Sequence, residues 1–283
     1  PPPLHDIYSI EDLKQLIYEL RQLNPAARIC VKLVSGKHVG TVAVGVVKAG
    51  ADIIQISGYD GGTGAAPLSS MRHAGLPWEL GLGEVHRALT ENELREYVTL
   101  RVDGGLSTAE DIVMATALGA EEFAFGKLLL VAQGCIMARI CEKNRCPTGI
   151  ATHDPKFKAK YKGKPEEIIE TLDRLAEGIR AFLADLGRRS LAELVGDTSI
   201  LEIDPTHRAR VVQRRIALGE LLHGRVRGTV SRRSLFDEGV NDLNAQIVAD
   251  LAAGSADGPY AIRSTDRAIP ARLCGELAAA SRD

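Results

Sequence analysis

The sequence predicts an α/β fold: a parallel sheet covered by helices, forming the C-terminal half of a (β/α)8 TIM barrel, followed by helices and a linker. Two observations support this prediction. Short apolar runs alternate with amphipathic helical patterns through the first two-thirds of the chain, and glycine is frequent (28 residues) while aromatic residues are scarce (4%). Alternating strands and helices with short links are typical of parallel βαβ units with right-handed crossovers. On pattern alone, a doubly wound sheet is an alternative.

Each predicted element rests on a local pattern of residues. Strands are predicted at residues 28–34, 53–57, 97–102 and 123–125, and helices between Ser9 and Asn24 and at residues 39–49, 109–118 and 166–186. The first helix begins at Ser9, because its hydroxyl and an acid three positions later, Asp12, form a helix-start signal. Gly50 and Gly119 fit the ends of the second and third helices. The last helix carries apolar residues on one stripe, which includes Ile169.

Composition excludes several classes of protein. The 283 residues are 45% hydrophobic and 25% charged, as in ordinary globular proteins, and the net charge of -2 gives no reason to expect nucleic acid or an anionic membrane. No apolar run approaches the roughly 20 residues of a membrane span. The start of the chain has no signal-peptide pattern and no initiator Met, which suggests an excised piece of a longer protein.

The chain is expected to divide into two parts. Residues 1–196 carry the predicted barrel portion, and residues 197–283 are expected to be a linker region toward a missing C-terminal domain. Residues 156–164 contain five lysines, and the short run, followed by Pro165 and two glutamates, is interpreted as a solvated loop rather than a binding patch.

Three of the five cysteines lie in one short stretch. Cys135, Cys141 and Cys146 follow the spacing C-x5-C-x4-C, and Pro147 follows the last of them. Thiolates are soft, charged donors for iron, and a cysteine followed by proline recurs in bacterial cluster motifs. Three cysteines favour a three-iron cluster, or a four-iron cluster with an outside ligand. Zinc with His153 as a fourth ligand and unliganded cysteines are the alternatives.

Glycine clusters follow three of the predicted strands. Their residues are Ser57, Gly58, Asp60, Gly61, Gly62, Thr63 and Gly64 in the first loop, Asp103, Gly104 and Gly105 in the second, and Gly126 and Lys127 in the third. Backbone N–H groups and one lysine at the carboxyl ends of barrel strands suit a phosphate dianion. Tight turns alone are the simpler explanation for any one cluster.

Lys32 stands alone within an apolar strand. A lysine there must be paired or reach a pocket, because an uncompensated buried charge is costly. The structural explanation is an ion pair with Asp60 or Asp103. The functional explanation is a cation placed near a cofactor that becomes negatively charged on reduction.

Taken together, these segments resemble the glutamate synthase large subunit. The matching motifs, in order, are Asp6–Leu13, Val31–Val34, Ser57–Gly64, His73–Gly81, Leu118–Phe123, the cysteine stretch through Thr152, and Thr265–Arg272. Three positions differ from the family pattern: Tyr59 replaces a usual histidine, Lys127 a usual small residue, and Gly105 a larger polar one.

The resemblance implies a barrel that holds FMN beside a 3Fe-4S cluster ligated by Cys135, Cys141 and Cys146. Lys32 matches the lysine that approaches the flavin ring, in a catalytic and cofactor-binding role. In the family, ammonia released from glutamine and 2-oxoglutarate give L-glutamate, with electrons from ferredoxin or an NADPH-oxidising small subunit. A stand-alone FMN barrel oxidoreductase acting on another substrate and a non-catalytic cluster-binding module are the alternative functions.

The resemblance also implies which parts are missing. The glutaminase domain and the first half of the barrel, which carries most 2-oxoglutarate contacts, are expected outside this chain. We therefore expect the isolated chain to be inactive. The expected location is the cytoplasm, or the plastid stroma in a photosynthetic eukaryote.

Overall fold

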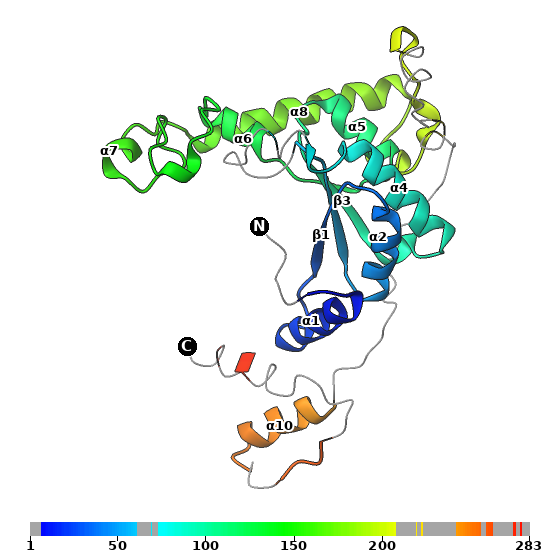
Figure 1. Cartoon of the computed structure of the whole chain (residues 1–283), viewed down its shortest axis with the longest axis vertical. Coiled ribbons are helices and arrows are strands. Elements are labelled where there is room, and N and C mark those ends of the chain that lie inside the picture. The colour runs from blue at the N-terminus through cyan, green and yellow to red at the C-terminus, as the bar shows by residue number, and fades with distance from the viewer. Residues whose placement is uncertain are drawn as a thin grey trace.

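The structure, a computed structural model, describes residues 7–60, 69, 73–207, 219, 222, 242–255, 259–262, 274–275 and 278 (Figure 1). Its elements are, in chain order, α1 (Ile10–Leu23), β1 (Cys30–Val34), α2 (Val39–Lys48), β2 (Ile53–Ser57), α4 (Trp78–Glu91), η1 (Arg95–Tyr97), β3 (Thr99–Asp103), α5 (Ala109–Ala117), β4 (Glu122–Phe123), α6 (Lys127–Ala132), η2 (Cys141–Lys143), α7 (Pro155–Lys158), α8 (Pro165–Asp185), η3 (Leu191–Glu193), η4 (Thr198–Ile200) and α10 (Asp242–Ala252). In these residues no helix combines the length and apolar character that crossing a membrane requires.

The four strands form one parallel sheet in the order β1-β2-β3-β4. Sheet order therefore follows chain order, whereas a doubly wound sheet reverses its strand order at a switch point. Within the described residues no such reversal occurs, so the strand order gives no support to the doubly wound alternative. The α/β class and the four parallel strands are confirmed.

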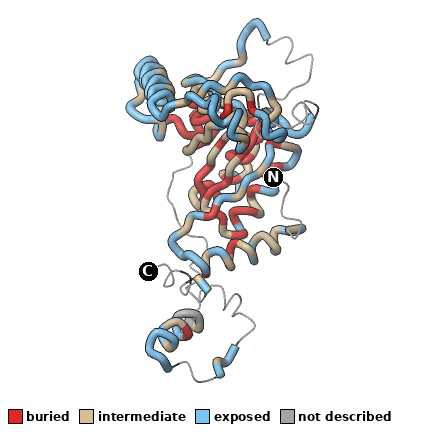
Figure 2. Tube along the Cα trace, turned by 90° about the vertical axis from the view of Figure 1, so that its left-hand side faces the viewer, coloured by how far each residue is buried: buried red, intermediate tan, exposed pale blue. Residues whose placement is uncertain are grey.

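The two faces of the sheet differ in character. Ile54, Ile56, Leu100 and Val102 are fully buried and face the core that α2, α4 and α5 contribute to. Figure 1 shows α2 and α4 side by side on this side of the sheet, and Figure 2 shows burial concentrated in the strands and the helices around them. The opposite face carries a row of polar residues at matching register positions, namely Lys32, Gln55, Arg101 and Glu122.

The local signals for helix ends are confirmed. Asp12 N–H donates to Ser9 Oγ at 3.2 Å and the Asp12 carboxylate accepts from the Ser9 N–H, which makes a capping box at the start of α1. Gly50 and Gly119 follow α2 and α5 with φ of 98° and 113°, the left-handed region that favours glycine. A Cβ on Gly119 would also lie 2.4 Å from the His86 ring, so this position has no room for a side chain.

Several predicted elements differ from the observed ones. The third strand begins at Thr99 rather than residue 97, because residues 95–97 form the short 3-10 helix η1 and bury the side chain of Arg95. The stripe predicted for α8 is partly wrong. Ile169 is 59% exposed, and Leu183 is the buried residue of this helix, which packs against α5 and α6.

A buried ion pair joins α4, η1 and the strand ends on the amino side of the sheet. Arg95 is 4% exposed, and its Nη2 lies 2.7 Å from Glu121 Oε2. The guanidinium also donates to the carbonyl oxygens of Val98 and Gly119 and to His86 Nδ1, at 2.8, 2.9 and 3.0 Å. All three guanidinium nitrogens therefore have partners, as a buried charge requires.

We predict that Arg95→Ala lowers the free energy of unfolding by about 3–5 kcal/mol, because it leaves the buried Glu121 carboxylate without a cationic partner and with only the Leu100 N–H as a donor. Arg174→Ala is the matched control: Arg174 pairs with Glu170 on the surface of α8, where a pair at this spacing contributes only about 0.3–0.5 kcal/mol. Urea denaturation followed by circular dichroism measures both. Equal losses for the two variants would contradict the structural role given to Arg95.

Candidate functional site

The loops after β2 and β3 meet at the carboxyl edge of the sheet. Gly58 N–H donates to the Asp103 carbonyl oxygen at 3.0 Å, and a Cβ on Gly104 would lie 2.6 Å from Gly58 N. Gly104 and Gly105 have φ of 106° and 109°, which only glycine adopts readily. The predicted glycines are therefore required at these positions, since a side chain on Gly104 would push the two loops apart.

The third loop joins this group through an ion pair. Lys127 Nζ, at the start of α6, lies 2.5 Å from Asp60 Oδ1 in the loop after β2. The second carboxylate oxygen of Asp60 would be 3.1 Å from a Cβ on Gly105, so the glycine makes room for the carboxylate. A Cβ on Gly126 would meet no atom within 4 Å, so open space lies beside this turn. One lysine and three glycine turns thus surround a single small region.

Lys32 is paired with Asp103, one of the two partners proposed from the sequence. Its Nζ lies 3.1 Å from Asp103 Oδ2, which also accepts from Gln55 Nε2 at 2.8 Å. The Lys32 side chain is 45% exposed on the polar face of β1, which is the edge strand of this sheet. The Lys32 ammonium therefore has a partner and, because its side chain is half exposed, can also reach a second anion.

Three buried polar atoms at this end of the sheet have no hydrogen-bond partner among the described residues. They are Asp103 Oδ1, Ser57 Oγ and Glu79 Oε2. Most buried polar atoms in proteins are hydrogen-bonded, so each such exception requires an explanation. Burial also raises the pKa of Glu79, a residue that the sequence analysis did not single out. Unpaired oxygens beside open glycine turns fit a site that takes a polar ligand.

Four of the predicted cofactor-binding residues lie outside the described residues: Gly61, Gly62, Thr63 and Gly64. The same holds for the motif Thr265–Arg272.

The three cysteines of the predicted cluster line one cavity of about 110 Å³. Its wall also includes Gly126 and Lys127, so the third glycine turn borders the cysteine site directly. The thiol of Cys146 is buried, whereas Cys141 is exposed. Cys30 and Cys274 are exposed and do not line this cavity. The structure thus brings together two groups of residues that the sequence predicted separately.

The arrangement of the thiols does not suit a single metal ion. Within the residues that the structure describes, no group of three or more His, Cys, Asp or Glu side chains could hold one ion, and His153 is not part of the cavity wall. The zinc alternative therefore finds no support. Three separated thiols around one cavity fit a cluster better, because a cluster distributes its cysteine ligands over several iron atoms.

Two of the sulfur atoms already accept hydrogen bonds. Met137 N–H donates to Cys135 Sγ at 3.4 Å, and the Thr148 hydroxyl lies 3.4 Å from Cys146 Sγ. Desolvation raises the pKa of Cys146, but the Thr148 hydroxyl and the backbone N–H groups of the same turn outweigh it and lower the pKa to about 7. Such hydrogen bonds favour thiolates, the form that ligates iron.

The cysteine stretch has an unusual backbone. Met137, Arg139 and Asn144 have positive φ, between 52° and 56°. Such conformations cost energy for residues other than glycine, and they persist where surrounding contacts hold them. Asn144 shows one such contact, because its Oδ1 accepts from His153 N–H at 2.7 Å. Sequence analysis missed Asn144, although asparagine is a residue that tolerates the left-handed region.

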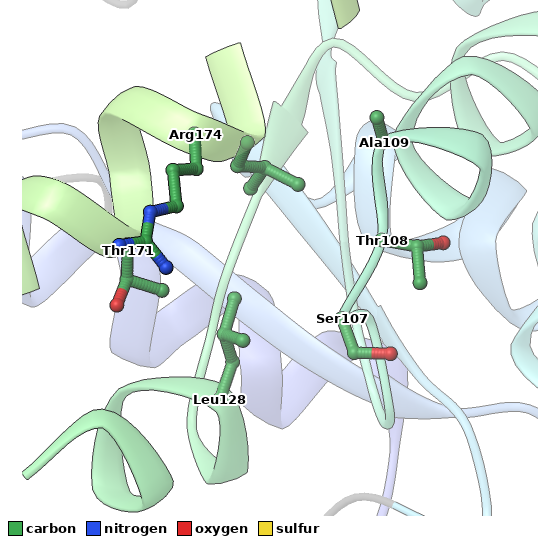
Figure 3. A pocket seen from close by; sticks show the side chains of 7 residues that line it. Ser107, Thr108, Ala109, Leu128, Thr171 and Arg174 are labelled. Carbon is green, nitrogen blue, oxygen red and sulfur yellow. The ribbon is translucent and has the colours of Figure 1, made fainter. Parts of the chain in front are cut away.

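A second cavity, of about 300 Å³, lies between α6, α8 and the residues that precede α5. Figure 3 shows Arg174 and Thr171 of α8 on one side of it and Ser107 and Thr108 on the other, with Leu128 of α6 between them. None of the predicted site residues lines this cavity.

Comparison with known proteins gives a consistent result. Residues 1–189 match a family model described as a conserved region in glutamate synthase. The chain is 47% identical over 290 residues to ferredoxin-dependent glutamate synthase 2 of Synechocystis sp.. This match covers 98% of this chain and 18% of that protein.

Two further relatives agree. The large chain of the NADPH glutamate synthase of Azospirillum brasilense is 47% identical over 295 residues, covering 96% of this chain and 18% of that protein. The ferredoxin-dependent glutamate synthase of Pyropia yezoensis is 58% identical over 201 residues, covering 71% of this chain and 13% of that protein. This chain spans less than a fifth of the length of these relatives, and it belongs to the glutamate synthase family.

Proposed function

We propose that this chain is the part of a glutamate synthase that holds FMN and a 3Fe-4S cluster. The complete enzyme would make L-glutamate from 2-oxoglutarate and ammonia. The observation that carries this proposal is the shared boundary of the two candidate sites: Gly126 and Lys127 belong both to the glycine turns and to the wall of the cysteine cavity. Two redox groups held this close can exchange electrons directly.

The sheet is proposed to be the second half of a (β/α)8 barrel. Support comes from the sequential parallel strand order and from the position of the candidate site at the carboxyl ends of the strands, where such barrels place their active sites. The polar row on the opposite face of the sheet would then line the interior of the barrel. Residues 197–283 are proposed to lead toward a further domain.

The glycine turns would hold the flavin. N–H groups near Gly104, Gly105 and Gly126, together with the Lys127 ammonium, would bind its phosphate group. Lys32 would place a positive charge near the ring. When bound, FMN supplies hydride transfer, and a nearby cation stabilises its reduced, anionic form.

Asp60 would compete with the phosphate group at this site. Its carboxylate pairs with the Lys127 ammonium, so a phosphate competes with it for the same cation. The Lys127 ammonium would then be paired with Asp60 when the site is empty and with phosphate when it is occupied. The empty site would therefore not leave an unpaired charge, which is costly where water is excluded.

Cys135, Cys141 and Cys146 would ligate the cluster, which supplies one-electron transfer. The hydrogen bonds that lower the pKa of Cys146 would favour its thiolate, and the Met137 N–H would orient the sulfur atom of Cys135. The relatives' names point to ferredoxin or to an NADPH-dependent partner as electron donor.

We predict that Lys127→Ala weakens FMN binding about 10-fold or more, because a hydrogen bond to a charged group contributes about 1.5–3 kcal/mol. Asp60→Asn should have the opposite effect, since it removes the carboxylate that competes for the lysine. Quenching of FMN fluorescence measures both dissociation constants, with Lys48→Ala, an exposed lysine at the end of α2, as control. Weaker binding in both variants would show that the ion pair only holds the loops together.

A second prediction concerns the cysteines. Serine at position 135, 141 or 146 should abolish the visible absorbance of an iron–sulfur cluster and the bound iron and sulfide after anaerobic reconstitution, because serine is a poor ligand for these clusters. The exposed Cys30 and Cys274 provide the controls Cys30→Ser and Cys274→Ser. Iron retained in all three single variants would contradict the cluster assignment.

These measurements also separate the alternatives. A chain that binds a cluster but no FMN would be a cluster-binding module. If the chain binds both groups, only the identity of the substrate distinguishes a glutamate synthase from another FMN-dependent oxidoreductase. Glutamate formation from 2-oxoglutarate and ammonia by the full-length protein is the test for that step.

A further inference from the structure

Gln55 is the polar residue in the middle of the apolar run of β2, and the proposed flavin and cluster sites give it no role. It occupies the same register position as Lys32 of β1 and Arg101 of β3, on the polar face of the sheet. Its Nε2 donates to Asp103 Oδ2 at 2.8 Å. The amide is therefore directed toward the carboxyl edge of the sheet, where the candidate site lies.

The direction of the Gln55 amide is fixed from both sides. On one side the Asp103 carboxylate only accepts hydrogen bonds, so the amide nitrogen and not the oxygen must face it. On the other side the Cys30 thiol is in position to donate to Gln55 Oε1, at 4.0 Å. Desolvation raises the pKa of Cys30, which keeps the proton on the sulfur. Turning the amide over would place two acceptors together, so its orientation is set.

The two oxygens of the Asp103 carboxylate have different surroundings. Oδ2 accepts from Gln55 Nε2 and also lies 3.1 Å from Lys32 Nζ, whereas Oδ1 is buried without a hydrogen-bond partner among the described residues. Without Gln55, the Lys32 ammonium would be the one described donor to this carboxylate. The carboxylate would then be free to rotate and bring both oxygens toward the ammonium, because such charge-assisted contacts are the strong ones. Gln55 therefore limits how completely Asp103 engages Lys32.

We propose that Gln55 is a positioning residue, which holds the Asp103 carboxylate so that the Lys32 ammonium stays available to reduced flavin. The inference rests on the proposed function, because it requires FMN beside Lys32. A carboxylate that meets the ammonium with both oxygens neutralises more of its charge. The anionic reduced ring would then lose stabilisation, whereas the neutral oxidised ring would lose little. Gln55 thus acts through two other side chains and favours the reduced form of the cofactor.

Gln55→Met, which keeps the length of the side chain and removes its hydrogen bonds, tests this role in the full-length protein with FMN bound. Fluorescence quenching gives the dissociation constant of oxidised FMN, and a redox titration followed by flavin absorbance then gives that of reduced FMN through the closed cycle. Binding of reduced FMN should weaken about 10-fold more than binding of oxidised FMN. The matched control is Gln15→Met, because Gln15 donates to the Glu19 carboxylate at 3.0 Å on the exposed side of α1. This control should stay within about twofold of the parent protein.

Gln55→Glu tests the hydrogen bond itself through its dependence on pH. Two carboxyl groups this close cannot both be ionised, so the introduced carboxyl shares a proton with Asp103 and its pKa is raised. At about pH 5 the protonated group donates to Asp103 as the amide does, and the ratio of the two dissociation constants should match the parent protein. As the pH rises through the raised pKa the donor is lost, and reduced FMN should bind progressively more weakly than oxidised FMN.

Gln55→Met provides the reference for this dependence. Both variants share the charged and titratable groups that face position 55 within the described part of the chain, namely Cys30, Lys32, Arg101, Asp103 and, beyond Arg101, Glu122. The ratio in Gln55→Met should therefore differ from that of the parent protein by the same factor at every pH.

Three outcomes would overturn the inference: equal weakening of oxidised and reduced FMN in Gln55→Met, a ratio in Gln55→Glu that does not change with pH, or an equal shift in the Gln15 control. Circular dichroism checks that each variant is folded, and Gln55→Glu at low pH provides a second folded form if Gln55→Met is unstable. A parent protein that binds no FMN would instead count against the proposed function, and its flavin content reports that separately.

Discussion

The candidate site depends on how closely the loops after β2 and β3 approach each other. Gly58 and Gly104 are in backbone contact, and neither position has room for a side chain. This contact brings Asp60 over Gly105, and Asp60 in turn pairs with Lys127 at the start of α6. Because α6 leads into the cysteine stretch, the position of the thiols also depends on this close approach.

Charge is distributed in two layers on the polar side of the sheet. Nearer its middle, Arg101 pairs with Glu122. Toward the carboxyl edge, Asp103 forms an ion pair with Lys32 and accepts a hydrogen bond from Gln55. In the first layer Glu122 also pairs with Arg28, so its carboxylate has two cationic partners, whereas in the second layer one oxygen of Asp103 has no partner among the described residues. The pairing thus confines unused hydrogen-bonding capacity to the edge where a ligand can enter.

Much of this arrangement could be predicted from local sequence. A capping box, apolar runs and glycines after helices predict the four strands and the helices α1, α2, α5 and α8, because these signals act over a few residues, whereas α4 and α6 were not predicted. Gln55 could have been found by the reasoning applied to Lys32, since it too interrupts an apolar strand. The Arg95–Glu121 pair and the partial exposure of the α8 stripe could not, because they depend on contacts between distant segments. The sequence predicts a solvated loop for the lysines of residues 156–164, and these lysines are exposed, but spacing alone does not reveal that Lys164 lies against Gln133, beside the cysteines.

Lys32 has one more consequence, for the edge of the sheet. β1 is an outer strand of the described sheet, and an edge strand exposes backbone groups that can pair with strands of other molecules. A charged side chain in the middle of such a strand hinders pairing with the edge strand of a second copy, because the ammonium would lose part of its hydration in the contact. The same residue proposed to approach the flavin would thereby limit self-association while the partly open sheet is exposed.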